Sequence, residues 1–469
     1  MSGLCVAARL KGAGISTFTI YEKGDRVGGT WRDNTYPGLC CDVPSHYYEY
    51  SFAPHAWDRL FARGPDIWRY LEQVTDDLGL RPHIAFGSEV IEAQFTGGGW
   101  LVRTGDEFEE TFDFLVAATG VLHHPHYPDI EGLSSFSGSA FHSARWDHDI
   151  ALAGRRVGVI GTGSTGVQIV AAIANEVAQL TVFQRSAQWI LPIPNLSYSP
   201  AVRARLERGW LRAIVDKVAA SVFSGFSKAT RQDGWQRSLI GALCRRSLAS
   251  VRSDDLRARL TPDYAPMCKR LVISSGFYGA MQRENVELIT DAIDRAEPTG
   301  VVTSDGRLHE LDVLVLATGF DAHAYVRPIK LVGEDGRTLD EEWRNGPRAY
   351  RTVMLPGFPN LFMMLGPHSP IGNISLVTIA ESQADYFMGW IARWQAGHAA
   401  TIVPTAAATD RFNEELRAAL PGTVWASGCR SWYIGQDGTP AVWPWSPIRH
   451  KQMLSAADLG EFEIGLVDR

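Results

Sequence analysis

The sequence predicts an α/β protein with two Rossmann-like dinucleotide-binding domains and a helical insertion. Three observations support this prediction. Two hydrophobic strands, at 113–120 and 312–319, end in the same tripeptide Ala-Thr-Gly, which indicates a repeated unit. A glycine-rich loop at 161–166 lies between an apolar strand and an apolar helical run, as in a nucleotide-binding β-α-β unit. An arginine-rich stretch at 199–264 lacks strand alternation and is expected to be helical.

The β-α-β unit around the glycine loop is complete in the sequence. Arg156 to Ile160 predicts a buried strand, Val167 to Val177 predicts a helix, and Leu180 to Phe183 predicts the second strand. The other unit begins at the start of the sequence, where Ser2-Gly3 leads into a helical run that ends near Leu10. Thr17 to Tyr21 predicts its next strand, and we expect this unit to lack its first strand, since nothing lies upstream to form it.

These elements divide the chain into five expected parts. They are the first part of the first dinucleotide-binding domain at 1–147, the first part of the second dinucleotide-binding domain at 148–198, a helical insertion at 199–264, the second part of the second domain at 265–320, and the second part of the first domain at 321–469.

Composition and charge favour small-molecule chemistry. The chain has 469 residues and a formal net charge of -7, so its surface does not suit the phosphate backbone of a nucleic acid. No apolar run is long enough to span a bilayer, and no secretion signal is evident, so we expect a cytoplasmic protein. The basic residues of 199–264 could meet a membrane or another anionic partner, but solvated helix faces explain them more simply.

The cysteines and histidines predict no metal site. Six cysteines show no paired metal-ligand spacing and are expected to be reduced thiols. His123, His124 and His126 lie close together, but no second ligand cluster accompanies them, and we interpret this stretch as a loop connector.

Which nucleotide each unit binds is predicted at the end of its second strand. An acidic residue there accepts hydrogen bonds from ribose hydroxyls, whereas an arginine accommodates a 2′-phosphate. Glu22 comes nineteen residues after Gly3, and Arg185, followed by Ser186, comes nineteen residues after Gly166. The first unit therefore suits FAD and the second suits NADPH. The expected contacts of NADPH in the glycine loop and the following helix are Gly161, Thr162, Gly163, Ser164, Thr165, Gly166 and Gln168.

Two further runs carry a family resemblance. Gly28-Gly29-Thr30-Trp31 and the stretch from Asp33 to Ser45 resemble the flavin-proximal segment of class B flavin monooxygenases. The run from Phe136 to Asp147 matches the Baeyer–Villiger fingerprint FxGxxxHxxxW(P/D) at every fixed position, namely Phe136, Gly138, His142, Trp146 and Asp147. Trp146-Asp147 favours the Baeyer–Villiger branch over the branch that oxidises nitrogen and sulfur. The resemblance extends over essentially the whole chain.

The resemblance implies roles for individual residues. Arg270 corresponds to the catalytic arginine and Asp42 to the acid that holds it beside the flavin. Lys269 is expected to bind the 2′-phosphate together with Arg185 and Ser186. The implied FAD contacts are Gly3, Glu22, Gly29, Thr30, Trp31, Asp42 and Tyr48, and Trp432 is implied near the nicotinamide. The loop at 366–373 is implied to face the flavin ring and to open a helix from about Ile374. His142 and Trp146 are expected to couple domain motion to catalysis.

The implied reaction inserts one oxygen atom of O₂ into a ketone to give an ester or lactone. NADPH would reduce the FAD, and the reduced flavin would capture O₂ as a C4a-peroxyflavin that supplies the oxygen atom. In the family the first glycine loop reads GxGxSGL, and only Ser2-Gly3-Leu4 of it is present here, which we expect to reflect an incomplete start. Two alternatives remain: an N- or S-oxidising flavin monooxygenase, and an inactive truncated NADPH-binding protein. The particular ketone and the oligomeric state are not predicted.

Overall fold

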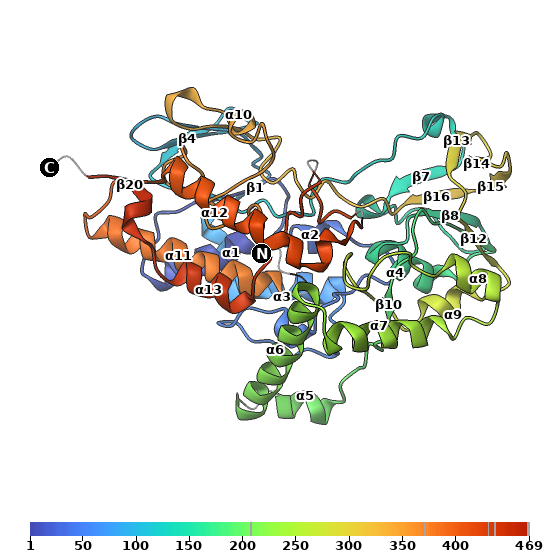
Figure 1. The fold of residues 1–469 in the computed structure, drawn as a ribbon. Helices are drawn as coiled ribbons and strands as arrows, with labels where there is room; N and C mark the ends of the chain where they lie inside the picture. The colour runs from blue at the N-terminus through green and yellow to red at the C-terminus, as the bar shows by residue number, and fades with distance from the viewer. Residues whose placement is uncertain (207–208, 370–371, 373, 430, 436–437, 467–469) are drawn as a thin grey trace.

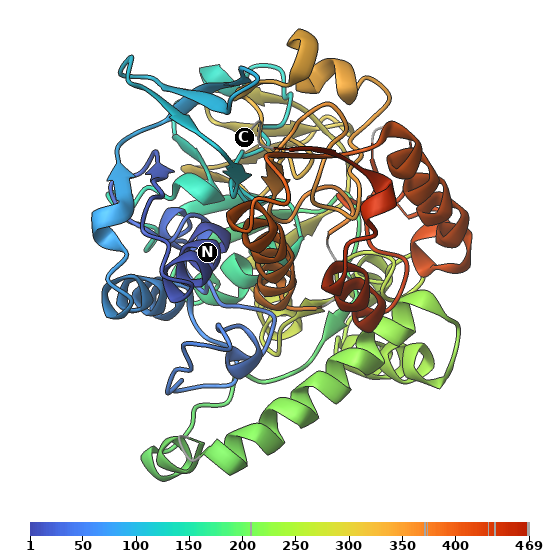
Figure 2. The ribbon, with the colours of Figure 1, turned by 90° about the vertical axis from the view of Figure 1, so that its left-hand side faces the viewer.

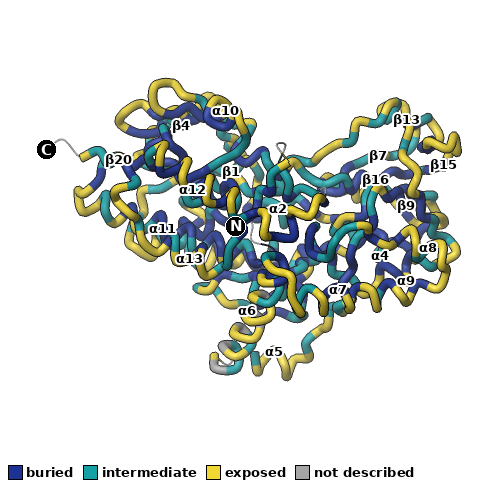
Figure 3. The backbone as a smooth tube through the Cα atoms, viewed as in Figure 1, coloured by how far each residue is buried: buried dark blue, intermediate teal, exposed yellow. Residues whose placement is uncertain are grey.

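The computed structural model describes the whole chain except residues 207–208, 370–371, 373, 430, 436–437 and 467–469; in helix α6 the side chains of 210, 213, 216, 219, 220 and 223 are also left undescribed. The ribbon forms two lobes side by side (Figure 1). One lobe contains both ends of the chain, and the other contains the glycine loop. A group of helices extends below them. Buried segments run through the middle of both lobes (Figure 3).

The lobe with the glycine loop is built on a five-stranded parallel sheet. Its order is β12 (Val286–Ile289), β9 (Gln179–Phe183), β8 (Arg156–Ile160), β16 (Val313–Leu316) and β7 (Ser139–His142). Helices α4 (Ser164–Ile173) and α9 (Phe277–Met281) pack with one face. An antiparallel sheet of β13 (Ile293–Glu297), β14 (Gly300–Thr303) and β15 (Leu308–Glu310) contributes Val301 to the other. Because both faces are covered, the central strands are mostly apolar and buried, with Arg156 and Gln179 at the first positions of β8 and β9.

The other lobe contains several smaller sheets. Parallel pairs are formed by β1 (Ile20–Glu22) with β2 (Ile84–Phe86), and by β6 (Leu115–Ala117) with β18 (Leu361–Met363). A four-stranded sheet has the order β17 (Lys330–Val332), β3 (Val90–Phe95), β4 (Trp100–Thr104) and β5 (Glu109–Phe112), and β19 (Thr401–Pro404) pairs with β20 (Phe462–Gly465). Its helices are α1 (Ser2–Gly12), α2 (Thr30–Asp33), α3 (Gly64–Asp77), α10 (Leu339–Glu342), α11 (Leu376–Gln395), α12 (Ala406–Ala419) and α13 (Pro447–Ser455).

Short 3₁₀ helices lie between these elements: η1 (Ser45–Tyr47), η2 (Arg81–His83), η3 (Leu133–Ser135), η4 (Ser143–Arg145), η5 (Glu334–Gly336), η6 (Leu420–Gly422), η7 (Val424–Ser427) and η8 (Leu459–Glu461). The two ends of the chain meet in one core, since α1 packs against α11 and their side chains share a hydrophobic cluster with Phe362 and Phe387.

The stretch predicted to be helical forms α5 (Pro200–Leu206), α6 (Gly209–Arg231), α7 (Trp235–Leu248) and α8 (Asp254–Arg259). These helices lie in the chain between β10 (Ile190–Leu191) and β11 (Val272–Ile273), which pair in parallel. Figure 2 shows α6 running along the lower side of the molecule, away from the sheets. Of the helices in the described part of the chain, none combines the length and the apolar content needed to cross a membrane.

Most predicted elements are present, with shifted ends. β8 has the predicted bounds, whereas the strands predicted at 113–120 and 312–319 are shorter because only their middles pair with neighbours. Helix α4 begins at Ser164 rather than Val167, since Gly163 is its N-cap and the last part of the glycine loop already forms the first helical turn. The strand predicted at Thr17 to Tyr21 pairs with β2 only over Ile20–Glu22.

One expectation needs correction. The six cysteines are not all reduced thiols: Cys268 and Cys429 form a disulfide, while Cys5, Cys40, Cys41 and Cys244 are free. The two partners are 161 residues apart in the chain, so sequence spacing did not reveal the pair. β7 pairs with β16 and therefore lies in the sheet of the second unit, which bears on the domain boundary expected at 147. We propose a boundary near residue 138.

The glycine loop provides a prediction on stability. A Cβ at Gly166 would lie 2.0 Å from the carbonyl oxygen of Gly161, whereas a Cβ at Gly163 would meet nothing within 4 Å. Backbone atoms this close have little freedom to move apart. We expect Gly166→Ala to lower the free energy of unfolding by about 1–3 kcal/mol, and Gly163→Ala by less than about 0.5 kcal/mol. Denaturant unfolding of the cofactor-free proteins measures both, and equal losses would contradict the close packing of Gly166.

Candidate active site

A cavity of about 1980 Å³ lies between the two lobes. Its lining comes from both lobes and includes Glu22, Asp42, Arg185, Arg270 and Trp432. The cavity thus brings the residues expected at the first nucleotide, the second nucleotide and the reaction centre to one continuous space. That volume exceeds the roughly 300–1,000 Å³ of an ordinary ligand pocket and suits more than one large ligand.

The glycine loop fits a dinucleotide. Gly161 has φ +110°, and a Cβ there would lie 2.4 Å from the carbonyl oxygen of Ala317, so the loop requires glycine. Gly163 caps α4 without a side-chain hydrogen bond. The N–H groups of the first turn, which includes Ser164 and Thr165, are therefore free of a capping side chain, and they suit a pyrophosphate at the cavity wall.

A basic cluster lies beyond β9 in the same wall. Lys269 Nζ donates to Ser186 Oγ at 2.9 Å and lies 4.3 Å from the ring centre of Tyr264. Thr162 Oγ1 donates to the carbonyl oxygen of Ser186 at 3.1 Å, which ties the cluster to the glycine loop. Arg185 is exposed and lines the cavity. Burial lowers the pKa of Lys269, and the charge of Arg185 lowers it further. Two cations held this close suit a doubly charged phosphate.

Gln168, which was predicted to contact NADPH, connects the two lobes. It lines the cavity, but its Nε2 donates to the carbonyl oxygen of Cys40 at 3.0 Å and its Oε1 accepts from the hydroxyl of Tyr36 at 3.1 Å. Both partners belong to the segment that follows the Gly29 turn. The side-chain amide of Gln168 therefore fixes the position of the glycine-loop helix against the segment that carries Asp42.

The residues predicted for FAD line the opposite part of the cavity. Glu22 ends β1, and its Oε1 accepts from Gly24 N at 2.8 Å and from Arg32 Nη1 at 3.0 Å. Gly29, with φ +53°, is the N-cap of α2. Trp31 Nε1 donates to the hydroxyl of Tyr48 at 3.1 Å. Gly3 lies in the first turn of α1 and also lines the cavity. These positions suit a second nucleotide that extends from Glu22 towards Trp31.

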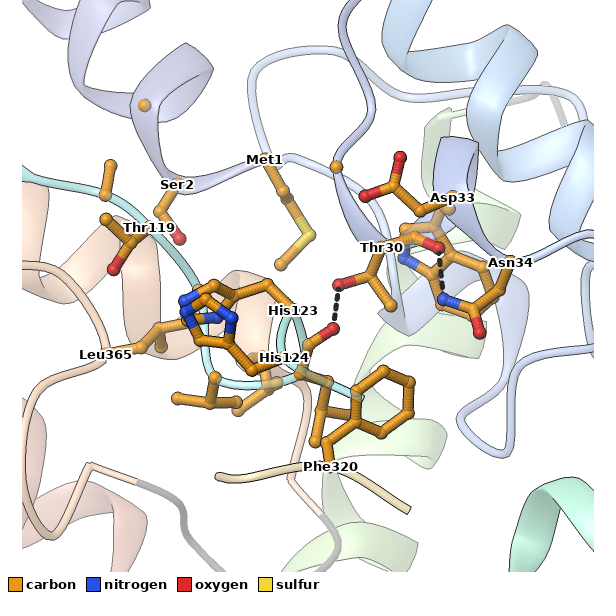
Figure 4. Close-up of a pocket in the computed structure, with 18 of the residues that line it drawn as sticks. Met1, Ser2, Thr30, Asp33, Asn34, Thr119, His123, His124, Phe320 and Leu365 are labelled. Carbon is orange, nitrogen blue, oxygen red and sulfur yellow. Dashed lines mark hydrogen bonds between the residues drawn. The ribbon is translucent and has the colours of Figure 1, made fainter. Parts of the chain in front are cut away.

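Figure 4 shows side chains that line this part of the cavity, among them Thr30, His123 and His124. Thr30 Oγ1 donates to the carbonyl oxygen of Leu122 at 3.2 Å, and this bond joins α2 to the loop after β6. The rings of His123 and His124 lie 4.0 Å apart beside Met1. Burial lowers the pKa of His123 to about 4, so its ring is neutral near pH 7. The loop that carries His123 and His124 therefore forms part of the cavity wall and also connects the lobes.

Arg270 and Asp42, predicted as catalytic, form a two-bond ion pair at the meeting point of the lobes. Arg270 Nε donates to Asp42 Oδ2 at 2.6 Å, and Nη2 donates to Oδ1 at 2.5 Å. The side chains are 27% and 19% exposed, and both line the cavity. Burial alone would lower the pKa of Arg270, but Asp42 and a hydrogen bond to Tyr433 raise it well above its usual value. The guanidinium is a fixed cation at any working pH.

The loop at 366–373 is only partly described, since 370–371 and 373 lie outside the described residues. Its first part is anchored by Gln383 of α11, whose Oε1 accepts from Leu365 N at 2.8 Å and whose Nε2 donates to Ser369 Oγ at 2.9 Å. Helix α11 begins at Leu376 with Ser375 as its N-cap, close to the predicted start at Ile374. Trp432 lines the cavity and lies 4.3 Å from the ring of Tyr433.

The fingerprint residues flank β7: Phe136 and Gly138 precede the strand, His142 ends it, and Trp146 and Asp147 follow it. His142 is 1% exposed; its Nδ1 accepts from Ala144 N at 3.1 Å, and its Nε2 lies 3.1 Å from the carbonyl oxygen of Gly319. A Cβ at Gly138 would lie 2.4 Å from the carbonyl oxygen of Asp312. Phe136 is buried in the cluster beneath β16, Trp146 packs edge-on against Phe141, and Asp147 is exposed in a turn. The segment fixes the path between the lobes and does not reach the reaction centre.

Three residues of this site were not assigned roles from the sequence: Tyr433, Tyr36 and Gln383. Tyr433 is 3% exposed and accepts a hydrogen bond from Arg270, so the guanidinium lies between two oxygen acceptors. Its position in the run Ser431-Trp432-Tyr433 was a signal, but nothing in that run indicates which ring faces Arg270. Tyr36 and Gln383 hold other groups in place, which only the fold reveals.

Tyr433 gives a testable prediction as a positioning residue. Tyr433→Phe removes one oxygen acceptor from Arg270, and a hydrogen bond to a charged group contributes about 1.5–3 kcal/mol. We expect the kcat for oxygen transfer to fall about tenfold or more, with little change in the KM for NADPH. Tyr278→Phe is the matched control, because the hydroxyl of Tyr278 is buried with no hydrogen-bond partner among the described residues. Equal effects of the two variants would contradict a role for the Tyr433 hydroxyl.

Comparison with known proteins agrees with this geometry. The flavin-binding monooxygenase-like family matches residues 18–199. An uncharacterized monooxygenase of Mycobacterium tuberculosis is 53% identical, over 99% of this chain and 97% of that protein. A Baeyer-Villiger monooxygenase of Streptomyces coelicolor is 38% identical, over 98% of this chain and 90% of its own length, and one of Pseudomonas aeruginosa is 34% identical, over 99% and 89%.

Solved structures give the same result. An oxidized steroid monooxygenase bound to NADP superposes with a TM-score of 0.88 at 33% identity, covering 99% of this chain and 97% of that one. Cyclohexanone monooxygenase from Rhodococcus sp. Phi1 bound to NADP+ has a TM-score of 0.88 at 29% identity, covering 98% and 96%. The chain belongs to the class B flavin monooxygenases, in the Baeyer–Villiger monooxygenase family, and the predicted α/β fold with two Rossmann-like domains is confirmed.

Proposed function

We propose that this protein is an FAD- and NADPH-dependent monooxygenase that inserts one oxygen atom of O₂ into a ketone and releases an ester or lactone. The observation that carries the proposal is the Arg270–Asp42 pair, which lies in the wall of the cavity where the two nucleotide-binding parts meet. When bound, NADPH supplies hydride to FAD and the flavin activates O₂. The roles of the surrounding residues follow from their positions.

Arg270 stabilises negative charge on oxygen. Ketone oxygenation requires an anionic oxygen that attacks the carbonyl carbon, and the carbonyl oxygen then gains negative charge. A guanidinium with a raised pKa cannot donate its proton to the attacking oxygen and quench it. Its fixed donors stabilise both charges without rearrangement. Asp42 and Tyr433 hold the guanidinium in place from two directions.

The basic cluster selects the reductant. Arg185, Ser186 and Lys269 bind the 2′-phosphate of NADPH, with Lys269 already bonded to Ser186. The glycine loop and α4 bind the pyrophosphate. Glu22, Gly29, Thr30, Trp31 and Tyr48 bind FAD in the other half of the cavity, and Trp432 lies at the nicotinamide side.

The experiment is a substrate screen with the purified protein, FAD, NADPH and air. Linear, cyclic, aryl and steroid-like ketones are tested as substrates, together with a thioether and a tertiary amine. The products are identified by mass spectrometry. We expect an ester or lactone from at least one ketone class, formed only with NADPH and flavin. Sulfoxide or N-oxide without any ester would assign the protein to heteroatom oxidation. A folded, colourless protein that binds NADPH but makes no product would contradict the enzymatic proposal altogether.

A further inference from the structure

The lower side of the molecule in Figures 1 and 2 is formed by α5, α6 and α7, none of which carries a residue assigned to the active site. Of the fifteen exposed large hydrophobic side chains described in the structure, seven lie on these three helices. On α6 they are Ile214, Val218 and Val222, each about half exposed. Their spacing of four residues places them along one face of the helix.

Helix α7 repeats this pattern. Trp235, Leu239 and Leu243 are again four residues apart and are 71%, 51% and 43% exposed. The opposite face of α7 is buried: Ile240 and Cys244 pack in a cluster with Trp425. Helices α6 and α7 also contact each other. The inner faces therefore complete the core, while the outer faces present apolar side chains for which the described chain provides no cover (Figure 3).

This apolar surface is also basic. Residues 199–264 contain 13 Lys and Arg against 6 Asp and Glu, a net charge of +7, in a chain whose total is -7. Ion pairs occupy Arg212, Arg237, Arg257 and Arg259. The exposed side chains of Lys217, Lys228, Arg245 and Arg246 have no acidic partner among the described residues, and Lys217 and Arg246 lie beside the two apolar rows.

We propose that the outer face of α6 and α7 docks on an anionic lipid bilayer, with the apolar rows in the interface and the basic side chains at the lipid phosphates. Helices that lie in a membrane surface combine an apolar face with lysine and arginine at its border. A second copy of the chain is a poorer occupant, because a two-fold contact through this face would bring its positive charges together.

The docking surface is connected to the active site through the core. The cluster that buries the inner faces of α6 and α7 also contains Leu271 and Tyr433, which lie beside and against Arg270. In a membrane-bound orientation, the helical side of the enzyme would therefore lie at the lipid surface. The cavity between the two lobes would lie on the side away from the membrane. The inference is independent of the proposed reaction, since it rests on exposed side chains and charge.

The test is flotation of the purified protein with phosphatidylcholine vesicles, with or without about 30% phosphatidylglycerol. We expect binding only to the anionic vesicles, weakened by high salt. Val218→Asp with Leu239→Asp should lower the bound fraction at least about tenfold, and so should Lys217→Glu with Arg246→Glu. The matched controls are Ile91→Asp, which replaces an equally exposed side chain on β3, and Lys451→Glu on α13, and both should bind like the unaltered chain.

Three results would overturn the proposal. The first is no binding to anionic vesicles by the unaltered protein. The second is binding that the α6 and α7 variants leave unchanged although the variants unfold at the same temperature as the parent. The third is a dimer in size-exclusion chromatography that Val218→Asp with Leu239→Asp converts to a monomer, without vesicle binding; this would assign the face to a second copy.

Discussion

We expect replacement of Arg270 by alanine to lower ester formation from ketones about a thousandfold, while reduction of bound FAD by NADPH should continue at nearly the parental rate. The physical reason is charge. Arg270 is held by two hydrogen bonds to Asp42 in the cavity wall and provides the fixed cation that an anionic oxygen requires. The basic cluster that we propose to bind NADPH does not include Arg270, so hydride transfer should keep its binding determinants.

Stopped-flow absorbance of the flavin measures the reduction step, and product analysis measures ester formation. Arg270→Lys should recover only a small part of the activity, because lysine cannot form the two parallel bonds to Asp42. Arg259→Ala, which removes an arginine from an exposed helix pair, is the control. Ester formation that is unchanged in Arg270→Ala would remove Arg270 from the mechanism, and an equal loss of flavin reduction would make it a general structural residue.

We expect Arg185→Ala to raise the KM for NADPH about ten- to a hundredfold and to leave the KM for NADH within about twofold. Only NADPH carries the 2′-phosphate, and Arg185 lies at the mouth of the Lys269–Ser186 cluster. Lys269→Ala should show the same selectivity. Combining the two substitutions should cost less than the sum of their separate effects, because both cations meet one phosphate.

Initial rates of flavin reduction with each nucleotide provide the measurement. Arg295→Ala is the matched control, since Arg295 is an exposed arginine on β13 of the same lobe and is paired with Asp294 and Glu297. A variant of Arg185 that loses NADPH and NADH equally would refute its role at the 2′-phosphate and would assign it to the pyrophosphate or to folding.

Local patterns in the sequence were enough to predict the second nucleotide-binding unit. The strand Arg156–Ile160, the glycine loop and the next strand follow one another, so period and glycine spacing define them together. The resemblance supplied the Arg270–Asp42 pair, whose members are 228 residues apart. No local pattern could have joined them, because their contact depends on how the two lobes meet.

The features that sequence reasoning missed are contacts between distant segments. In the sequence, Cys268 and Cys429 are two isolated cysteines, and nothing there indicates that they form a disulfide. Gln168 was expected to contact NADPH and does line the cavity, but its hydrogen bond to Cys40 across the lobes was not foreseen. From the sequence, the apolar rows of α6 and α7 could not be distinguished from the buried face of an ordinary helix. Periodicity shows that a face is apolar but not whether the fold covers it.

The most direct test of the proposed function is isotope labelling of the product. The purified protein is supplied with FAD, NADPH and a ketone accepted in the screen, under ¹⁸O₂ in unlabelled water. The account predicts an ester or lactone that contains one ¹⁸O atom, at the bridging position, while the original carbonyl oxygen stays unlabelled. An unlabelled ester or lactone, or a product labelled at the carbonyl oxygen and not at the bridging oxygen, would contradict the assignment of this protein as a ketone monooxygenase.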